Sequence, residues 1–102
     1  MVLKTEPYDS ADYLDSAEAV AAYLEVAFED GDPAQIAHAL GVAARARGMS
    51  EVARATGLSR ESLYRALSSD GNPAFSTVIR VINALGLRLT AAAISQPEHR
   101  DT

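Results

Sequence analysis

The sequence predicts an all-α fold, and three observations support this class. Apolar residues recur every three or four positions along most of the chain, which is the spacing of one face of a helix. Glycines, prolines and capping serines divide this pattern into five segments. Only residues 87–94, LRLTAAAI, alternate weakly between apolar and polar positions. They could form a short strand or an extended arm, and a strand would need a partner strand that the rest of the chain does not offer.

The first two helices are expected at residues 16–30 and 33–47. Ser16 suits the N-cap of the first helix, and Gly31 follows its last residue. Pro33 suits the first turn of the second helix, which runs to Gly48. The apolar stripes that should face inward are Val20, Tyr23, Leu24, Ala27 and Phe28 in the first helix, and Ile36, Leu40 and Ala43 in the second.

Three shorter helices are expected in the second half of the chain. Ser50 should cap the third helix, which Gly57 stops. Ser59 should cap the fourth, which runs to about residue 68, and the turn-forming sequence SSDGNP (68–73) follows it. The fifth helix closes at Gly86. Its apolar stripe consists of Phe75, Val78, Ile79, Ile82 and Leu85.

Composition limits the classes of function that the chain could have. A chain of 102 residues that is 48% hydrophobic is long enough for one core and one domain. It has no cysteine, and no apolar run reaches the roughly 18 residues that a membrane helix needs. No signal peptide is apparent, so we expect a cytoplasmic protein. Two histidines and scattered carboxylates make no metal cluster, and no nucleophile motif is present, so we expect neither a cofactor nor an enzyme.

Charge is distributed unevenly along the chain. Residues 1–32 hold nine acidic residues and one lysine, which gives −8, whereas residues 33–95 hold seven arginines and three acidic residues, which gives +4. Residues 96–102 contribute −1, and the net charge is −5. Such an asymmetry is typical of a protein with two kinds of partner, although an acidic segment could also be a solvated helix face.

Residues 50–67, SEVARATGLSRESLYRAL, have the spacing of a helix-turn-helix. Ala53 is small where the second helix must cross the first, and Gly57 can adopt the left-handed backbone of the turn. Apolar residues bracket both positions, namely Val52, Leu58, Leu63 and Leu67. The pattern therefore predicts a DNA-binding element, although a helical hairpin that serves only the core would share it.

The outward side of the second helix carries the candidate DNA contacts. Arginine can pair bidentately with guanine, glutamate can accept from cytosine, and a serine at a helix N-terminus can bind a phosphate. The residues expected to contact DNA are Ser50, Ser59, Arg60, Glu61, Ser62, Tyr64 and Arg65. Arg65 could instead be a solvated charge, and Tyr64 could be half in the core. His38 has no ligand partners nearby in sequence and is expected to have a structural role.

The residues from 36 to 89 resemble the Xre/Cro (lambda-repressor-like) class of helix-turn-helix domains, which are bundles of five helices. Nearly the whole chain resembles the addiction-module antidote family of HigA-like antitoxins. The shared segments are YDSADYL (8–14), EDGDP (29–33), ALGVAARARGMS (39–50), TGLSRESLYRALSSDGNP (56–73) and FSTVIRVINALGLRL (75–89). The resemblance implies an antitoxin of a type II toxin–antitoxin module that binds a RelE/HigB-type toxic RNase and represses its own operon as a homodimer.

These observations divide the chain into three parts: an acidic segment with one helix at 1–32, a helix-turn-helix domain at 33–95, and a disordered tail at 96–102. The groove of an RNase should be basic, so the acidic helix could bind the toxin through Tyr23, Leu24, Glu25, Phe28 and Glu29. The apolar stripe of this helix could instead pack on the chain's own bundle, which would leave only its acidic rim for the toxin. Two alternatives for the whole protein are a stand-alone Xre-type repressor without a toxin and an interaction module that never binds DNA.

Overall fold

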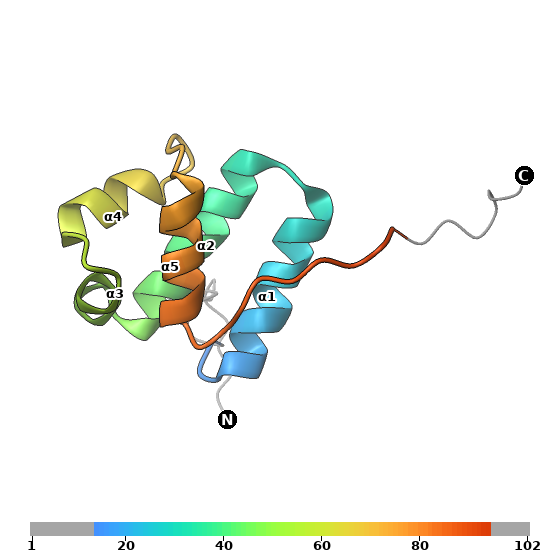
Figure 1. Cartoon of the computed structure of the whole chain (residues 1–102), viewed down its shortest axis with the longest axis horizontal. Helices are drawn as coiled ribbons and strands as arrows, with labels where there is room; N and C mark the ends of the chain where they lie inside the picture. The colour runs from blue at the N-terminus through green and yellow to red at the C-terminus, as the bar shows by residue number, and fades with distance from the viewer. Residues whose placement is uncertain (1–13, 95–102) are drawn as a thin grey trace, which may run out of the picture.

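The computed structural model describes residues 14–94, which form five helices joined by short turns (Figure 1). The helices are α1 (Ala17–Asp30), α2 (Pro33–Arg47), α3 (Met49–Thr56), α4 (Arg60–Ala66) and α5 (Phe75–Ala84). The all-α prediction is confirmed for this part of the chain. The predicted disorder of residues 96–102 and the first part of the acidic segment, residues 1–13, lie outside the described residues.

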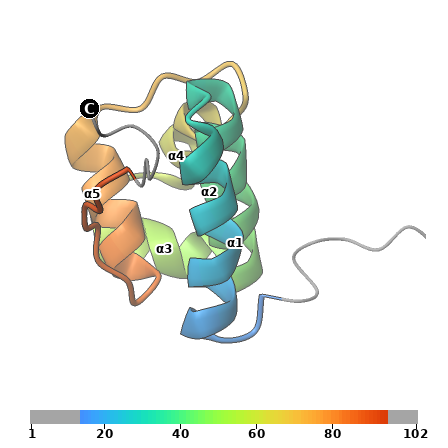
Figure 2. The ribbon, with the colours of Figure 1, turned by 90° about the vertical axis from the view of Figure 1, so that its right-hand side faces the viewer.

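The first two helices begin and end as the sequence predicts. The backbone N–H of Ala19 donates to Ser16 Oγ at 3.1 Å, which is the expected N-cap of α1. Gly31 ends α1, and Pro33 occupies the first turn of α2. Val20 and Leu24 of α1 are buried, and α1 lies beside α2 in both views (Figure 1 and Figure 2).

One hydrophobic core holds all five helices together. Its largest fully buried side chains are Leu40 of α2, Val52 of α3, Leu63 of α4, Val81 of α5 and Leu85, which caps α5. Val20 and Leu24 belong to the same cluster of packed side chains. The acidic helix is therefore packed into the same bundle as the other four helices. The division of the chain at residue 32 reflects a change in the sign of the charge.

Arg47 joins the end of α2 to the end of α5. Its Nη2 donates to the carbonyl oxygen of Leu85 at 3.3 Å, and its Nη1 donates to that of Ala84 at 3.5 Å. The last carbonyls of a helix have no partners within the helix and carry partial negative charge, so a guanidinium is favourable there. This arginine therefore has a structural role at the end of both helices.

The prediction that Ser50 caps the third helix is wrong. The helix begins one residue earlier, at Met49, and Gly48 is its N-cap, with φ of 116° and ψ of 113°. This backbone conformation is open to glycine, and it lets α2 lead into α3 through a single residue. The carbonyl of Gly48 accepts from the N–H of Val52 at 3.0 Å, so Ser50 lies exposed within the first turn.

Two other predictions need correction, and one open alternative is decided. The fourth helix ends at Ala66, about two residues before the predicted end, because Leu67 leaves the helical conformation. Phe75 is 71% exposed, since it is the first residue of α5 and lies beyond the core that the later turns of this helix contact. Of the two alternatives for residues 87–94, the structure has the extended arm, because residues 14–94 contain no second strand with which a strand could pair. Leu87 packs against the core, and residues 88–94 are exposed along the arm (Figure 1).

No helix within residues 14–94 has the length and apolar character needed to cross a membrane.

Candidate functional site

The two helices of the predicted DNA-binding element lie at one end of the molecule. Figure 1 shows α3 and α4 on one side of α2 and α5, with α1 on the other side. Figure 2, viewed from the side of α1, shows α3 and α4 farther from the viewer than α1, between α5 and α2. The basic candidate site and the acidic helix are therefore on opposite sides of the bundle.

The turn between α3 and α4 is fixed by hydrogen bonds to one carbonyl group. The oxygen of Ala53 accepts from the N–H of Gly57 at 2.9 Å, from the N–H of Leu58 at 3.2 Å and from Thr56 Oγ1 at 3.2 Å. Gly57 has φ of 79°, which confirms the predicted left-handed position. This geometry fixes the direction in which α4 leaves the turn.

Thr56 has a part in the turn that sequence reasoning missed. Its side chain is buried, and Oγ1 both donates to Ala53 and accepts from the N–H of Leu58 at 3.3 Å. A threonine one residue before a turn glycine can make these local side-chain to backbone hydrogen bonds, so its position in the sequence could have indicated this role.

The inward side of α4 packs closely on α3 and α2. Leu63 is fully buried and Leu67 nearly so, and Ala53 is buried at the predicted crossing point. A Cβ atom added at Gly41 of α2 would lie 2.6 Å from the carbonyl oxygen of Leu67. Gly41, which sequence reasoning also missed, therefore lets the end of α4 approach α2. A glycine inside a helical pattern was the signal for this close approach.

The N-terminus of α4 is held by two serines among the candidate DNA contacts. Ser59 Oγ accepts from the N–H of Ser62 at 3.0 Å and donates to Ser62 Oγ at 2.9 Å. Ser59 is the N-cap that the sequence predicted, and it is exposed, whereas Ser62 is half-buried. The Ser59 hydroxyl both accepts and donates within the cap. The hydroxyl proton of Ser62 therefore remains free to donate to another group.

The outward side of α4 presents four other candidates together. Arg60, Glu61, Tyr64 and Arg65 are all exposed, whereas Ser50 belongs to α3. The guanidinium carbon of Arg60 lies 5.9 Å from the centre of the Tyr64 ring, within the range of a cation–π interaction. This contact holds Arg60 along the helix surface. The exposed side of α4 therefore carries two arginines and several hydrogen-bonding groups.

The loop after α4 is folded back onto the end of the helix. Ser68 Oγ donates to the carbonyl of Arg65 at 3.1 Å, and the N–H of Gly71 donates to the carbonyl of Ser68 at 2.8 Å. A Cβ atom at Gly71 would collide with the carbonyl of Ala66. The loop thus covers the last carbonyls of α4 and holds Ser68 beside the exposed face.

The structure adopts the second of the two predicted arrangements for the acidic helix. Leu24 is 2% exposed, while Tyr23 and Phe28 are half-buried against the core, so the apolar stripe packs on the bundle. Leu24 therefore has no surface to offer a partner. Residues 14–32 contain six acidic residues and no basic ones, and all six are exposed: Asp15, Glu18, Glu25, Glu29, Asp30 and Asp32.

An apolar side chain on α1 was missed among these charges. Val26 is 68% exposed, and it lies one residue from Glu25 and a turn before Glu29. We call the surface formed by Glu18, Glu25, Val26 and Glu29 the acidic face. It combines exposed carboxylates with one exposed apolar side chain, and protein interfaces commonly combine apolar and polar contacts in this way.

Comparison with known proteins identifies relatives of the whole chain. A family model described as "Probable addiction module antidote protein" matches residues 4–93. An uncharacterized protein of Haemophilus influenzae is 44% identical over 88 residues, which are 86% of this chain and 91% of that protein. No solved structure matches the chain significantly.

Proposed function

The chain belongs to the family of probable addiction module antidote proteins, and on this premise we propose that it is an antitoxin that also binds operator DNA. An antidote protein implies a toxin as its partner. The DNA-binding part of the proposal rests on α3, the Gly57 turn and α4 acting as a helix-turn-helix, with α4 as the helix that reads bases. The observation that carries it is the exposed face of α4.

The side chains on that face suit recognition of base edges in the major groove. Arg60 and Arg65 can each make paired hydrogen bonds to guanine, and Glu61 can accept from cytosine. The cation–π contact with Tyr64 limits the freedom of Arg60 before DNA arrives, which reduces the entropy lost on binding. Ser50, Ser59 and Ser62 lie at helix N-termini, where hydroxyl and N–H groups suit phosphates.

We further propose that the protein binds its operator as a homodimer. The seven residues of α4 span about 10 Å, at 1.5 Å per residue, so one copy can read only a few base pairs. Two copies related by a twofold axis would read an inverted repeat and repress the operon that encodes them.

The toxin in this proposal is a RelE/HigB-type RNase, and the acidic face of α1 is the surface that captures it. An enzyme that binds RNA needs a basic groove, and the carboxylates of Glu25 and Glu29 are complementary to such a groove. Val26 supplies an apolar contact, with the half-buried Tyr23 and Phe28 near the rim. The opposite placement of α1 and α4 would allow the protein to hold DNA and toxin together.

The DNA-binding proposal is tested by replacing both arginines of α4. Arg60→Ala/Arg65→Ala should weaken binding to the DNA upstream of the protein's own gene by at least about tenfold for each arginine that pairs with a base. The control, Arg80→Ala/Arg88→Ala, removes the same charge from exposed positions on α5 and the arm. Equal affinities of the two double variants would contradict the assignment of α4 as the reading helix.

A further inference from the structure

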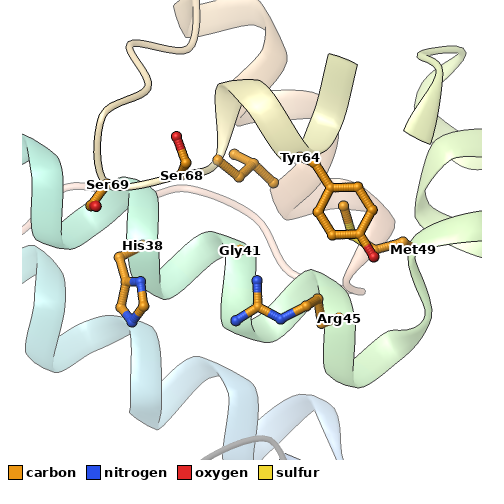
Figure 3. Close-up of a pocket in the computed structure, with 8 residues that line it drawn as sticks. His38, Gly41, Arg45, Met49, Tyr64, Ser68 and Ser69 are labelled. Carbon is orange, nitrogen blue, oxygen red and sulfur yellow. The ribbon is translucent and has the colours of Figure 1, made fainter. Parts of the chain in front are cut away.

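A hollow between α2 and α4 borders the exposed face of the proposed reading helix. Its volume is about 280 Å³, and it is drawn in Figure 3. His38, Gly41 and Arg45 line it from α2, while Tyr64, Ser68 and Ser69 line it from α4 and the following loop. None of its lining residues is acidic.

The hollow follows from the spacing of residues on α2 and from the close approach at Gly41. His38, Gly41 and Arg45 are three and four residues apart, so they share one side of the helix. The absence of a side chain at Gly41 opens the floor, and the Arg45 guanidinium lies back over it. Arg45 Nη1 is 3.5 Å from the position that a Gly41 Cβ would occupy.

The chemistry of the lining favours an anion. Arg45 offers a guanidinium with several N–H donors, and His38, Tyr64 and Ser69 add further hydrogen-bonding groups. The Ser68 hydroxyl already donates to the Arg65 carbonyl, and Met49 and Leu67 form the apolar part of the lining. Arginine is especially suited to phosphate because its planar fork can donate two parallel hydrogen bonds. No carboxylate lines the hollow, so none of its lining residues would repel a phosphate.

The position of the hollow indicates which phosphate it would hold. The major groove is about 12 Å wide and a helix with its side chains is about 10–12 Å across, so a helix in the groove lies close to the backbone on both sides. Tyr64 belongs both to the exposed face of α4 and to the lining of the hollow. A DNA strand that runs along this side of α4 would therefore pass over Arg45.

We propose that this hollow binds a backbone phosphate of the operator, with Arg45 as the main ligand. The proposal rests on the proposed function, in which α4 enters the major groove. A phosphate contact carries no sequence information, so Arg45 would fix the position of α4 on the DNA while Arg60 and Arg65 select the sequence.

The test compares Arg45→Ala with Arg80→Ala, which removes the same charge from an exposed position on α5, in the full-length protein. Arg45→Ala should weaken binding to operator and to unrelated DNA by the same factor, about tenfold at low salt. The slope of log K against log salt should fall by about 0.9 for each phosphate no longer neutralised, or about 1.8 for a dimer. Arg45→Lys, which keeps the charge without the fork, should restore the slope and part of the affinity.

Each outcome of this test is informative. If Arg45→Ala has the affinity and slope of Arg80→Ala, while Arg60→Ala/Arg65→Ala still loses binding, the phosphate site is refuted and the proposed reading helix stands. If Arg45→Ala instead loses toxin capture with DNA binding unchanged, the hollow is part of a protein interface and the inference is wrong. If the parent protein fails to bind its own upstream DNA, the proposed function and the inference both fall.

Discussion

Two glycines, Gly57 and Gly41, position α4, the proposed reading helix, for different physical reasons. Gly57 has φ of 79°, and a Cβ atom there would meet nothing within 4 Å, so only its backbone conformation restricts the residue. Gly41 lies inside α2, and what restricts it is the carbonyl of Leu67, 2.6 Å from where a Cβ would lie. A residue that tolerates left-handed backbone could replace the first glycine, whereas any side chain at the second would push α4 away from α2.

At Gly57, the identity of the replacement should decide the effect on stability. Gly57→Val should lower the free energy of unfolding by about 1–3 kcal/mol, because a β-branched side chain is strained at positive φ. Gly57→Asn should lower it much less, since asparagine enters the left-handed region more readily. Denaturant titration of both variants measures this difference. Equal stability of the valine variant and the parent would show that the turn tolerates other conformations.

At the scale of the helix, α1 has a buried apolar side and an exposed acidic side. Val20 and Leu24 are buried in the shared core, so deletion of residues 1–30 would expose the apolar surface of α2. A truncated protein that failed to bind the toxin could therefore have lost either the proposed acidic face or its fold, and the experiment would not separate the two causes. Substitutions on the acidic face leave the core unchanged and separate the two effects.

Charge reversal on the acidic face should slow capture of the toxin. Glu25→Lys/Glu29→Lys should reduce the association rate most at low salt, where attraction between exposed charges is least screened. The control Glu51→Lys/Asp70→Lys makes the same change of charge at exposed positions outside α1. Association rates measured over a range of salt concentrations provide the comparison. If the two variants lose rate equally, net charge and not the acidic face governs the encounter.

Sequence periodicity predicted the positions of the helices better than it predicted how one helix connects to the next. The bounds of α1 and α2 and the turn at Gly57 follow from local caps, breakers and spacing, and the structure confirms them. Ser50 was misassigned because a serine resembles a cap wherever it precedes a helix, whereas Gly48 performs this role through its backbone. Local pattern could not show that α2 leads into α3 through one residue.

Burial was harder to predict because it depends on contacts between distant segments. Phe75 fits the apolar stripe of α5 but lies at its exposed first turn, and Val26 is exposed although it is apolar. Whether Leu24 faces a partner or its own bundle could not be decided from spacing, since both arrangements require the same stripe. The hollow lined by His38 and Arg45 was likewise hidden, because it joins residues of α2 to residues of α4 and the following loop, which lie far along the chain.

On the scale of the whole molecule, separation of charge would let an acidic protein approach DNA as proposed. The net charge is −5, yet α1, which carries the acidic face, lies on the side of the bundle opposite α4 (Figure 1). At about 0.15 M salt, interactions between exposed charges fall off over about 8 Å, so the acidic face is well screened from a duplex held at α4. The same arrangement would leave α1 accessible in the proposed complex with DNA.

The proposed dimer predicts the form of the operator. Two copies of α4 should protect an inverted repeat whose half-sites are separated by one or two helical turns, at about 34–36 Å per turn. Footprinting of the upstream DNA, together with the mass of the complex in solution, measures both the spacing and the number of copies. Protection of one half-site by a single copy would show that dimerisation is not needed for recognition.

The central claim is that α4 holds the operator while the acidic face of α1 holds the toxin, and one mobility-shift measurement tests it most directly. Labelled operator is mixed with the parent, with Arg60→Ala/Arg65→Ala or with Glu25→Lys/Glu29→Lys, and the toxin is then added. The parent should shift the operator, and added toxin should shift it further. Arg60→Ala/Arg65→Ala should give no shift at low protein concentration. Glu25→Lys/Glu29→Lys should shift the operator, but added toxin should cause no further shift. A further shift by toxin with the α1 variant equal to that of the parent, or an operator shift by the α4 variant equal to that of the parent, would contradict the claim.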